Sequence, residues 1–312
     1  MTNDKINKWI SEKVPEMTGK QVIITGANSG LGLEVSKVFA AKGANLIMAC
    51  RNISKGEEAL HSIKEIYPGA SVEIAELDLA DLNSVQSFVD KITKEYNLLD
   101  ILCNNAGVMA LPELRTKDGF EMQFGTNHLG HFSLTLGLLP LLNASNGARV
   151  VNTSSMAAKM GNIDFLNLNA EKKYDKWGAY GQSKLANLLF TFELQRKLQK
   201  SGSGITVFSS HPGYSATNLL TTGPKLEGAS VKKKFMQLAD SLIATKASLG
   251  ALSTIYAATS PDVKEGALYG PAFFGMWGLP AENKIVEKGK DPETALKLWD
   301  VSEKLTGMRM ES

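Results

Sequence analysis

Cysteine, charge imbalance and long apolar runs are all scarce in this chain of 312 residues. The only two cysteines, Cys50 and Cys103, each end a short apolar run, where a cysteine typically serves as a small buried hydrophobe. We therefore expect neither a disulfide nor a metal site built on cysteine. The formal net charge is +2, with basic residues scattered among nearly as many acids, and this excludes the basic footprint of a nucleic-acid-binding protein.

No uninterrupted apolar run reaches 18 residues, so no transmembrane segment is expected. The polar start, MTNDKINKWISEKVPEM, does not match a signal peptide, and we expect a cytoplasmic protein. The length fits one large domain or two. Residues 4–13 predict a short amphipathic helix whose apolar anchors are Trp9 and Ile10. The helix belongs to a lead-in segment, 1–18, that either packs on the main body or lies on a membrane surface.

A strand, a glycine-rich turn and a helix follow one another near the start of the main body. A β-branched run at 22–24 precedes TGANSGLG, and a helical pattern continues through Ala41. Glycines in this context allow a tight turn and close backbone approach, so that a pyrophosphate can lie on the helix N-terminus. An ordinary strand-to-helix turn is the alternative. The candidate cofactor-binding residues of this stretch are Gly26, Asn28, Ser29, Gly30, Leu31 and Gly32.

The second predicted strand, 45–50, ends in Arg51. An acidic residue at this position suits the ribose hydroxyls of NAD, whereas an arginine can pair with the 2′-phosphate of NADP. Arg51 therefore predicts NADP as the preferred cofactor, with NAD as the other candidate. A solvated surface arginine is the alternative interpretation.

Two further strand ends carry candidate cofactor contacts. Asp78 and Leu79 follow the strand at 72–77, and Asp78 can hydrogen-bond the adenine, cap the helix that starts near Asp81, or do both. The strand at 100–103 leads into an NNAG sequence, in which asparagines tie the turn and small residues leave room for a ligand against the backbone. The candidates in this turn are Asn105, Ala106 and Gly107.

Helical periodicity over 120–142 carries Asn127, and a buried amide in a helix needs partners and can bend the helix or hold water there. His128 and His131 are three residues apart on the same segment. No third ligand in metal-like spacing accompanies them, so we do not expect a metal site.

Tyr180 and Lys184 are four residues apart in a helical stretch that runs to about Lys200, so they share one face. A neighbouring ammonium is one of the few groups that lowers the pKa of a tyrosine toward neutral pH. Upstream, a strand at 149–155 ends in Ser155 at the edge where open α/β sheets bind ligands. Taken alone the tyrosine–lysine pair also fits a half-packed tyrosine beside a solvated lysine.

These motifs occur in one order along the chain: TGANSGLG, NNAG, the helix asparagine, the strand-end serine, YGQSK and HPGYSAT. Over residues 18–270 the chain resembles the short-chain dehydrogenase/reductase family. The resemblance implies an α/β fold of Rossmann type, doubly wound, with a mostly seven-stranded parallel sheet and helices on both faces. It also implies a single domain, 19–312, and a homo-oligomeric state.

By this resemblance Tyr180 is the general acid/base, and Lys184 lowers its pKa and binds the nicotinamide ribose. Ser155 orients the reacting oxygen, and Asn127 holds a water in the proton relay. The residues that would contact the nicotinamide are Pro212, Gly213 and Thr217. These roles agree with hydride-transfer chemistry, which needs one group to stabilise charge on the carbonyl oxygen and another to supply a proton.

The long serine-to-tyrosine interval, NHLGHF and the ending LWDVSEKLTG are similar to the branch of the family that contains retinol dehydrogenases and protochlorophyllide reductases, whose substrates are large and apolar. The chain has no cysteine after Cys103, unlike the light-dependent protochlorophyllide reductases, and it lacks the membrane-anchoring apolar segment of many retinol dehydrogenases. We expect a substrate lid at about 218–245 and a C-terminal extension at 271–312, loop-rich over 271–290 and helical over 292–306.

The sequence therefore predicts an NADP-dependent oxidoreductase that interconverts an alcohol and a carbonyl, on a medium to large apolar substrate. The alternative is a non-catalytic dinucleotide-binding regulator or partner-binding module. The presence of all four proton-transfer residues favours the enzyme, because a pure binder does not need them.

Overall fold

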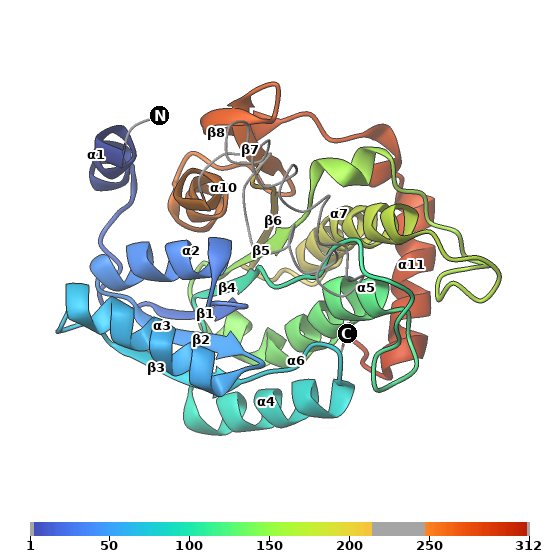
Figure 1. Ribbon diagram of the computed structural model, residues 1–312, viewed down its shortest axis with the longest axis horizontal. Coiled ribbons are helices and arrows are strands. Elements are labelled where there is room, and N and C mark those ends of the chain that lie inside the picture. Colours follow the sequence, from blue (N-terminus) through green and yellow to red (C-terminus); the bar gives the residue numbers. More distant parts are fainter. Residues whose placement is uncertain (1–2, 214–246, 311–312) are drawn as a thin grey trace, which may run out of the picture.

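A computed structural model describes residues 3–213 and 247–310, and an eight-stranded sheet runs through its centre (Figure 1). The strands are β1 (Gln21–Thr25), β2 (Asn45–Cys50), β3 (Val72–Glu76), β4 (Ile101–Asn104), β5 (Arg149–Thr153), β6 (Thr206–Ser210), β7 (Leu268–Phe273) and β8 (Trp277–Asn283). They are ordered β3-β2-β1-β4-β5-β6-β7-β8. Neighbouring strands pair in parallel from β3 to β7, and β8 pairs antiparallel with β7.

Helices connect these strands and cover both faces of the sheet (Figure 1). The α-helices are α1 (Asn3–Lys13), α2 (Gly30–Ala41), α3 (Ile53–Ile66), α4 (Leu82–Glu95), α5 (Met122–Phe124), α6 (Gly130–Ala144), α7 (Lys176–Lys200), α10 (Ala247–Thr259) and α11 (Pro292–Thr306). A π-helical turn, η1 (Gly125–Leu129), joins α5 to α6, and two short 3-10 turns are η2 (Met156–Lys159) and η3 (Glu287–Gly289).

Two hydrophobic cores lie on opposite faces of the sheet because successive strand residues point to opposite sides. Val22 and Ile24 of β1 face the core covered by α2, α3 and α10, whereas Ile23 faces the core covered by α4, α6 and α7. Helix α1 packs outside α10, with the ring centroids of Trp9 and Tyr256 6.2 Å apart. Both faces are buried, which explains the nearly continuous apolar strands of the sequence.

The predicted α/β class is confirmed, with seven parallel strands and helices on both faces. The prediction of a loop-rich segment at 271–290 is wrong, because β7 and β8 form a hairpin there. Prolines and glycines suggested a loop. Pro271 and Pro280 are instead paired opposite each other beside a register irregularity, beyond the last pairing of β7 with β6 at Tyr269, where no hydrogen bond to a further strand is required.

The helix predicted over 120–142 starts at Met122 and is interrupted by the π turn η1. The carboxylate of Glu121 caps its start by accepting from the N–H groups of Gln123 and Phe124. The interruption falls on the segment that carries Asn127, in line with the expectation that a buried amide perturbs the helix there.

The predicted lid, 218–245, and Thr217 lie outside the described residues. No helix in the described parts of the chain is long and apolar enough to cross a membrane. The division into a lead-in of residues 1–18 and a domain of 19–312 stays a prediction.

Candidate active site

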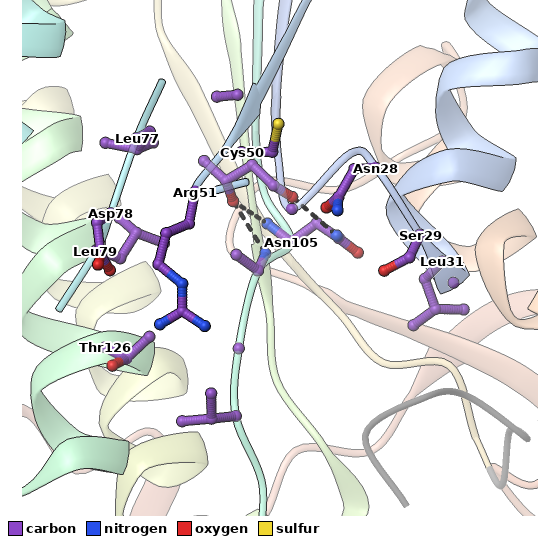
Figure 2. Close-up of a pocket in the computed structure, with 17 residues that line it drawn as sticks. Asn28, Ser29, Leu31, Cys50, Arg51, Leu77, Asp78, Leu79, Asn105 and Thr126 are labelled. Atoms are coloured by element: carbon purple, nitrogen blue, oxygen red, sulfur yellow. Dashed lines mark hydrogen bonds between the residues drawn. The ribbon is translucent and has the colours of Figure 1, made fainter. Parts of the chain in front are cut away.

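A cavity of about 300 Å³ opens at the carboxyl ends of the first four strands (Figure 2). It lies where the strand order reverses between β1 and β4, the position at which open α/β sheets bind ligands. Its walls are Thr25, Gly26, Asn28, Ser29, Gly30, Leu31, Ala49, Cys50, Arg51, Leu77, Asp78, Leu79, Asn105, Ala106, Gly107, Val108 and Thr126. Eleven of the candidate cofactor-binding residues are among them; Gly32 packs just behind the turn.

The glycine turn forms a cradle that side chains would fill. A Cβ at Gly32 would lie 2.4 Å from the carbonyl oxygen of Gly26 and 2.6 Å from Asn105 Nδ2, so only glycine fits. Gly26 and Gly30 have φ values of +64° and +55°, which glycine adopts without strain. Ser29, the N-cap of α2, makes no side-chain cap bond, which leaves the first N–H groups of the helix available to an anion.

Arg51 follows β2 and extends past Asp78 toward Thr126 (Figure 2). No acidic or other partner engages its guanidinium among residues 3–213 and 247–310. Asp78 accepts a hydrogen bond from the N–H of Ala80, and Asp81, not Asp78, caps α4. The capping alternative for Asp78 is therefore wrong, and its carboxylate borders the cavity.

The hydroxyl of Thr25 joins the two loops that flank the cavity. Its oxygen accepts from the N–H groups of Asn105 and Ala106, each at 2.9 Å, and the Asn105 side-chain amide donates to the Thr25 carbonyl at 2.9 Å. A Cβ at Gly26 would lie 3.0 Å from Ala106, so the two loops are in contact. The NNAG turn thus forms one wall of the cavity.

Tyr180 and Lys184 lie on α7 at the inner end of this region, and both are buried. Lys184 Nζ lies 5.9 Å from the centre of the Tyr180 ring and donates to the Thr153 carbonyl at 3.1 Å. Burial lowers the pKa of the Lys184 ammonium to about 8. A Cβ at Gly107 would lie 3.3 Å from Lys184 Nζ, so the NNAG wall of the cavity reaches the lysine.

Burial raises the pKa of the Tyr180 phenol, and a hydrogen bond with Ser155 opposes that rise. The Lys184 ammonium, predicted to lower this pKa, is held to the Thr153 carbonyl and lies 5.9 Å from the centre of the phenol ring. Ser155 is the N-cap of η2, where its hydroxyl oxygen accepts from the N–H of Ala157. The structure thus brings Ser155, Tyr180 and Lys184 into one group, and their catalytic roles stay predictions.

Asn127 lies in the π turn η1, fully buried. Its side-chain amide donates to the Val108 carbonyl and the Ser183 hydroxyl, both at 2.9 Å, and its side-chain oxygen accepts from the Val108 N–H at 2.8 Å. Its main-chain carbonyl accepts from His131 Nδ1 at 3.0 Å. The expected need of this amide for partners is met by protein groups on two neighbouring segments.

A second cavity, of about 330 Å³, adjoins Ser155 on the side of the β7–β8 hairpin. Its lining residues are Ser155, Met156, Ala158, Lys159, Leu188, His211, Leu268, Ala272, Phe274, Gly275, Asn283, Lys284 and Val286. Pro212 and Gly213 follow β6 beside it, and Gly213, with a φ of +71°, donates its N–H to His211 Nδ1. A Cβ at Gly213 would lie 2.5 Å from the Met276 carbonyl oxygen.

Several lining residues were missed from the sequence: Thr25, Ala49, Cys50, Leu77, Val108 and Thr126. Five of them lie within two residues of a predicted strand end or turn motif, and this closeness could have been used to predict them as lining residues. Thr126 comes from the helix after β4, and only the folded arrangement brings it to the cavity.

A sheet reversal, a glycine cradle at a helix N-terminus and a second loop against it are features of a dinucleotide-binding α/β protein. The short chain dehydrogenase family profile matches residues 20–226, two thirds of the chain. The chain therefore belongs to the short-chain dehydrogenase family, and it is an NAD(P)-dependent oxidoreductase acting on CH–OH groups.

Relatives and solved structures extend this result over nearly the whole chain. Human retinol dehydrogenase 14 is 40% identical over 307 residues, covering 94% of this chain and 88% of the relative. Mouse retinol dehydrogenase 11 is 38% identical over 317 residues, covering 100% and 95%. The crystal structure of an uncharacterised protein from Mycobacterium paratuberculosis is similar with a TM-score of 0.80 and 42% identity, covering 97% of this chain and 99% of that one. A short chain dehydrogenase from Shigella flexneri, solved with NADP, shares the fold at a TM-score of 0.62 and 22% identity, covering 82% and 98%.

Proposed function

We propose that this oxidoreductase uses NADP(H) to interconvert an alcohol and a carbonyl on a medium to large apolar substrate, with Tyr180 as general acid/base. The observation that carries the proposal is the group formed by Ser155, Tyr180 and Lys184. Ser155 opposes the rise that burial causes in the pKa of the Tyr180 phenol, and the buried ammonium lies next to the wall of the dinucleotide cavity.

The residues present fit a dinucleotide. The N-terminus of α2 and the glycine cradle suit a pyrophosphate, and Asp78 and the NNAG loop border the position of the nucleoside. The reduced nicotinamide supplies a hydride when bound. Arg51, which has no partner among the described residues, supports the preference for NADP because its fork of donors matches a 2′-phosphate.

Tyr180 would donate the proton to the carbonyl oxygen during reduction and accept it during alcohol oxidation. The Ser155 hydroxyl would bond the same substrate oxygen, so that charge developing there is stabilised as the proton moves. Lys184 would hold the ribose and favour the phenolate. Asn127 would fix the loop at Val108 and contribute to the proton relay, since its carbonyl keeps a second lone pair beside the one that His131 occupies.

An apolar substrate is supported by the cavity beside Ser155, where Met156, Leu188, Leu268 and Phe274 contribute apolar surface. The relatives named retinol dehydrogenases support the same class, since retinol is a long apolar alcohol. Pro212 and Gly213 follow His211, which lines this cavity, and they would contact the nicotinamide.

The test is NADPH oxidation by wild type and Tyr180→Phe against aliphatic aldehydes, retinal, steroids and quinones, repeated with NADH. Positioned proton transfer is worth about 10² to 10⁴ in rate, so Tyr180→Phe should lose most turnover and keep its affinity for NADPH. Tyr269→Phe is the matched control, because Tyr269 is a buried tyrosine that lines neither cavity and accepts from the Lys264 N–H. Equal turnover in wild type and Tyr180→Phe would refute the assigned role, and absence of NADPH binding would refute the whole proposal.

A further inference from the structure

His131 is a buried histidine of α6 that contacts the candidate site at both ring nitrogens. Nε2 lies 2.9 Å from the hydroxyl oxygen of Thr25, at the end of β1. Nδ1 lies 3.0 Å from the main-chain carbonyl oxygen of Asn127 in the π turn. One imidazole thus joins the cofactor loops to the segment that carries a predicted catalytic residue.

The hydrogen bonds of Thr25 determine what Nε2 does. The threonine oxygen already accepts two N–H groups, from Asn105 and Ala106, so its single proton must be donated elsewhere. His131 Nε2 at 2.9 Å is the closer acceptor, and the Cys103 carbonyl is at 3.4 Å. Nε2 must therefore be unprotonated and accept from the hydroxyl.

The other ring nitrogen requires the same form of the imidazole. A carbonyl oxygen only accepts, so Nδ1 must carry the hydrogen that is donated to Asn127. Burial favours this neutral form by lowering the pKa of His131 to about 4. Both contacts thus require the neutral tautomer with its hydrogen on Nδ1. With the hydrogen there, Nδ1 donates to Asn127 and Nε2 is free to accept from Thr25.

The hydrogen-bonded path continues from Asn127 to the proposed general acid. The Asn127 side chain donates to the Ser183 hydroxyl at 2.9 Å, and that hydroxyl donates to the Tyr180 carbonyl at 2.8 Å. Asn127 also holds both polar groups of the Val108 backbone, at the cavity wall. All these partners are protein groups in the interior, so the path does not depend on an exposed side chain.

We propose that His131 is a positioning residue of the reaction, holding the Thr25 hydroxyl that fixes the cofactor loops and the Asn127 carbonyl of the catalytic segment at the same time. This inference rests on the proposed function. Loss of the Thr25 contact would loosen the loops around the cofactor, whereas loss of the Asn127 contact would loosen the segment behind Tyr180. The two contacts therefore affect different kinetic quantities.

His128 provides the matched control for a histidine that is only part of the core. It is equally buried and lies three residues earlier, among the rings of Phe124, Phe132 and Phe190. Its Nε2 bonds the hydroxyl of Ser302 on α11, and it lines neither cavity. A purely structural cost of replacing a buried imidazole should appear at His128 as well.

Two substitutions separate the contacts of His131. In His131→Gln the amide reaches the position of Nε2 and keeps Thr25 but gives up the Asn127 carbonyl, whereas in His131→Asn the shorter amide keeps Asn127 and gives up Thr25. We would measure the Kd for NADPH by fluorescence titration, kcat and KM for an aldehyde, and the thermal midpoint, in both variants and in His128→Gln.

We expect His131→Asn to raise the NADPH Kd about tenfold with a smaller change in kcat, and His131→Gln to lower kcat about tenfold with the Kd nearly kept, since an unmade buried hydrogen bond has an effect of this order. His128→Gln should lower only the thermal midpoint. Equal effects of the two His131 variants on Kd and kcat, or effects no larger than those of His128→Gln, would overturn the inference. If wild type binds NADPH without turnover, the proposed function fails, and the Kd comparison still decides the role of His131.

Discussion

The Lys184 ammonium donates to the main-chain carbonyl of Thr153 at 3.1 Å, so the buried cation is held to β5 and not to the phenol one turn away. The Asn187 side chain donates to the same carbonyl at 3.0 Å. The Lys184 side chain is therefore held in position by a carbonyl of the sheet. Its ammonium lies buried beside Tyr180 and has no carboxylate partner among the described residues. Such an arrangement opposes stability while it favours phenolate chemistry.

Lys184→Met is expected to stabilise the folded protein at pH 7 while abolishing turnover. Burial lowers the pKa of Lys184 to about 8, whereas an unfolded lysine titrates near 10.4. Between these values the unfolded state binds more protons, so the wild type gains stability as pH rises from about 8 to about 10.4 and lacks that gain at pH 7.

Urea unfolding should therefore show Lys184→Met more stable by roughly 1–3 kcal/mol at pH 7, with the difference shrinking above pH 8. Lys200→Met, an exposed change on the same helix, should show no such pH dependence. A Lys184→Met protein that is less stable than wild type at pH 7 would contradict this account.

Ser155→Ala is expected to raise the pKa of Tyr180 further, because it removes the hydrogen bond that opposes the effect of burial. Alcohol oxidation needs the phenolate as base, so kcat/KM rises with pH as Tyr180 ionises. In the residual activity of the variant this rise, called here the rising limb, should move to higher pH. Ser155→Thr keeps the hydroxyl and should leave the limb near its wild-type position. An unchanged limb in Ser155→Ala would show that this hydroxyl does not act on the phenol.

Arg51→Asp is expected to reverse the cofactor preference. The carboxylate would repel a 2′-phosphate and accept from ribose hydroxyls, so kcat/KM should fall about 100-fold with NADPH and rise with NADH. Lys55→Ala, which removes an exposed cation one turn into α3 outside the cavity, is the control and should change neither value. Parallel losses with both cofactors would mean that Arg51 supports the fold and does not select the cofactor.

Gly32→Ala is expected to abolish NADPH binding. The added methyl would lie 2.4 Å from the Gly26 carbonyl oxygen, and the backbone of the turn would have to move. An alanine at Gly204 meets no atom within 4 Å and should leave both stability and the NADPH Kd unchanged. Retention of tight NADPH binding by a folded Gly32→Ala protein would place the pyrophosphate elsewhere.

The local parts of the site could be predicted from the sequence because each depends on a short stretch of chain. Gly26, Gly30 and Gly32 lie in one strand–turn–helix unit, and Tyr180 and Lys184 share a helical face by spacing alone. The family resemblance added the roles of Ser155 and Asn127, which remain proposals.

The parts that could not be predicted depend on distant contacts. Thr25 and His131 are 106 positions apart, and only the placement of β1 beside β4 brings α6 to the end of β1. The attachment of Lys184 to Thr153 likewise depends on α7 packing over β5. The β7–β8 hairpin was missed because proline and glycine indicate a loop when the neighbouring strand is unknown.

The π turn at 125–129 fixes how the residues before it are rotated about the helix axis relative to those of α6. An α-helix advances about 100° per residue, so shortening this turn by one residue would restore uniform α geometry and rotate the residues before it by about that angle relative to α6. Asn127 would then swing away from Val108 and Ser183, while the apolar side chains of α6 stayed on the core. The extra residue of the π turn thus lets Asn127 face Val108 and Ser183 while the apolar side chains of α6 face the core. A helix with a constant 3.6-residue repeat would not point both sets of side chains in these directions.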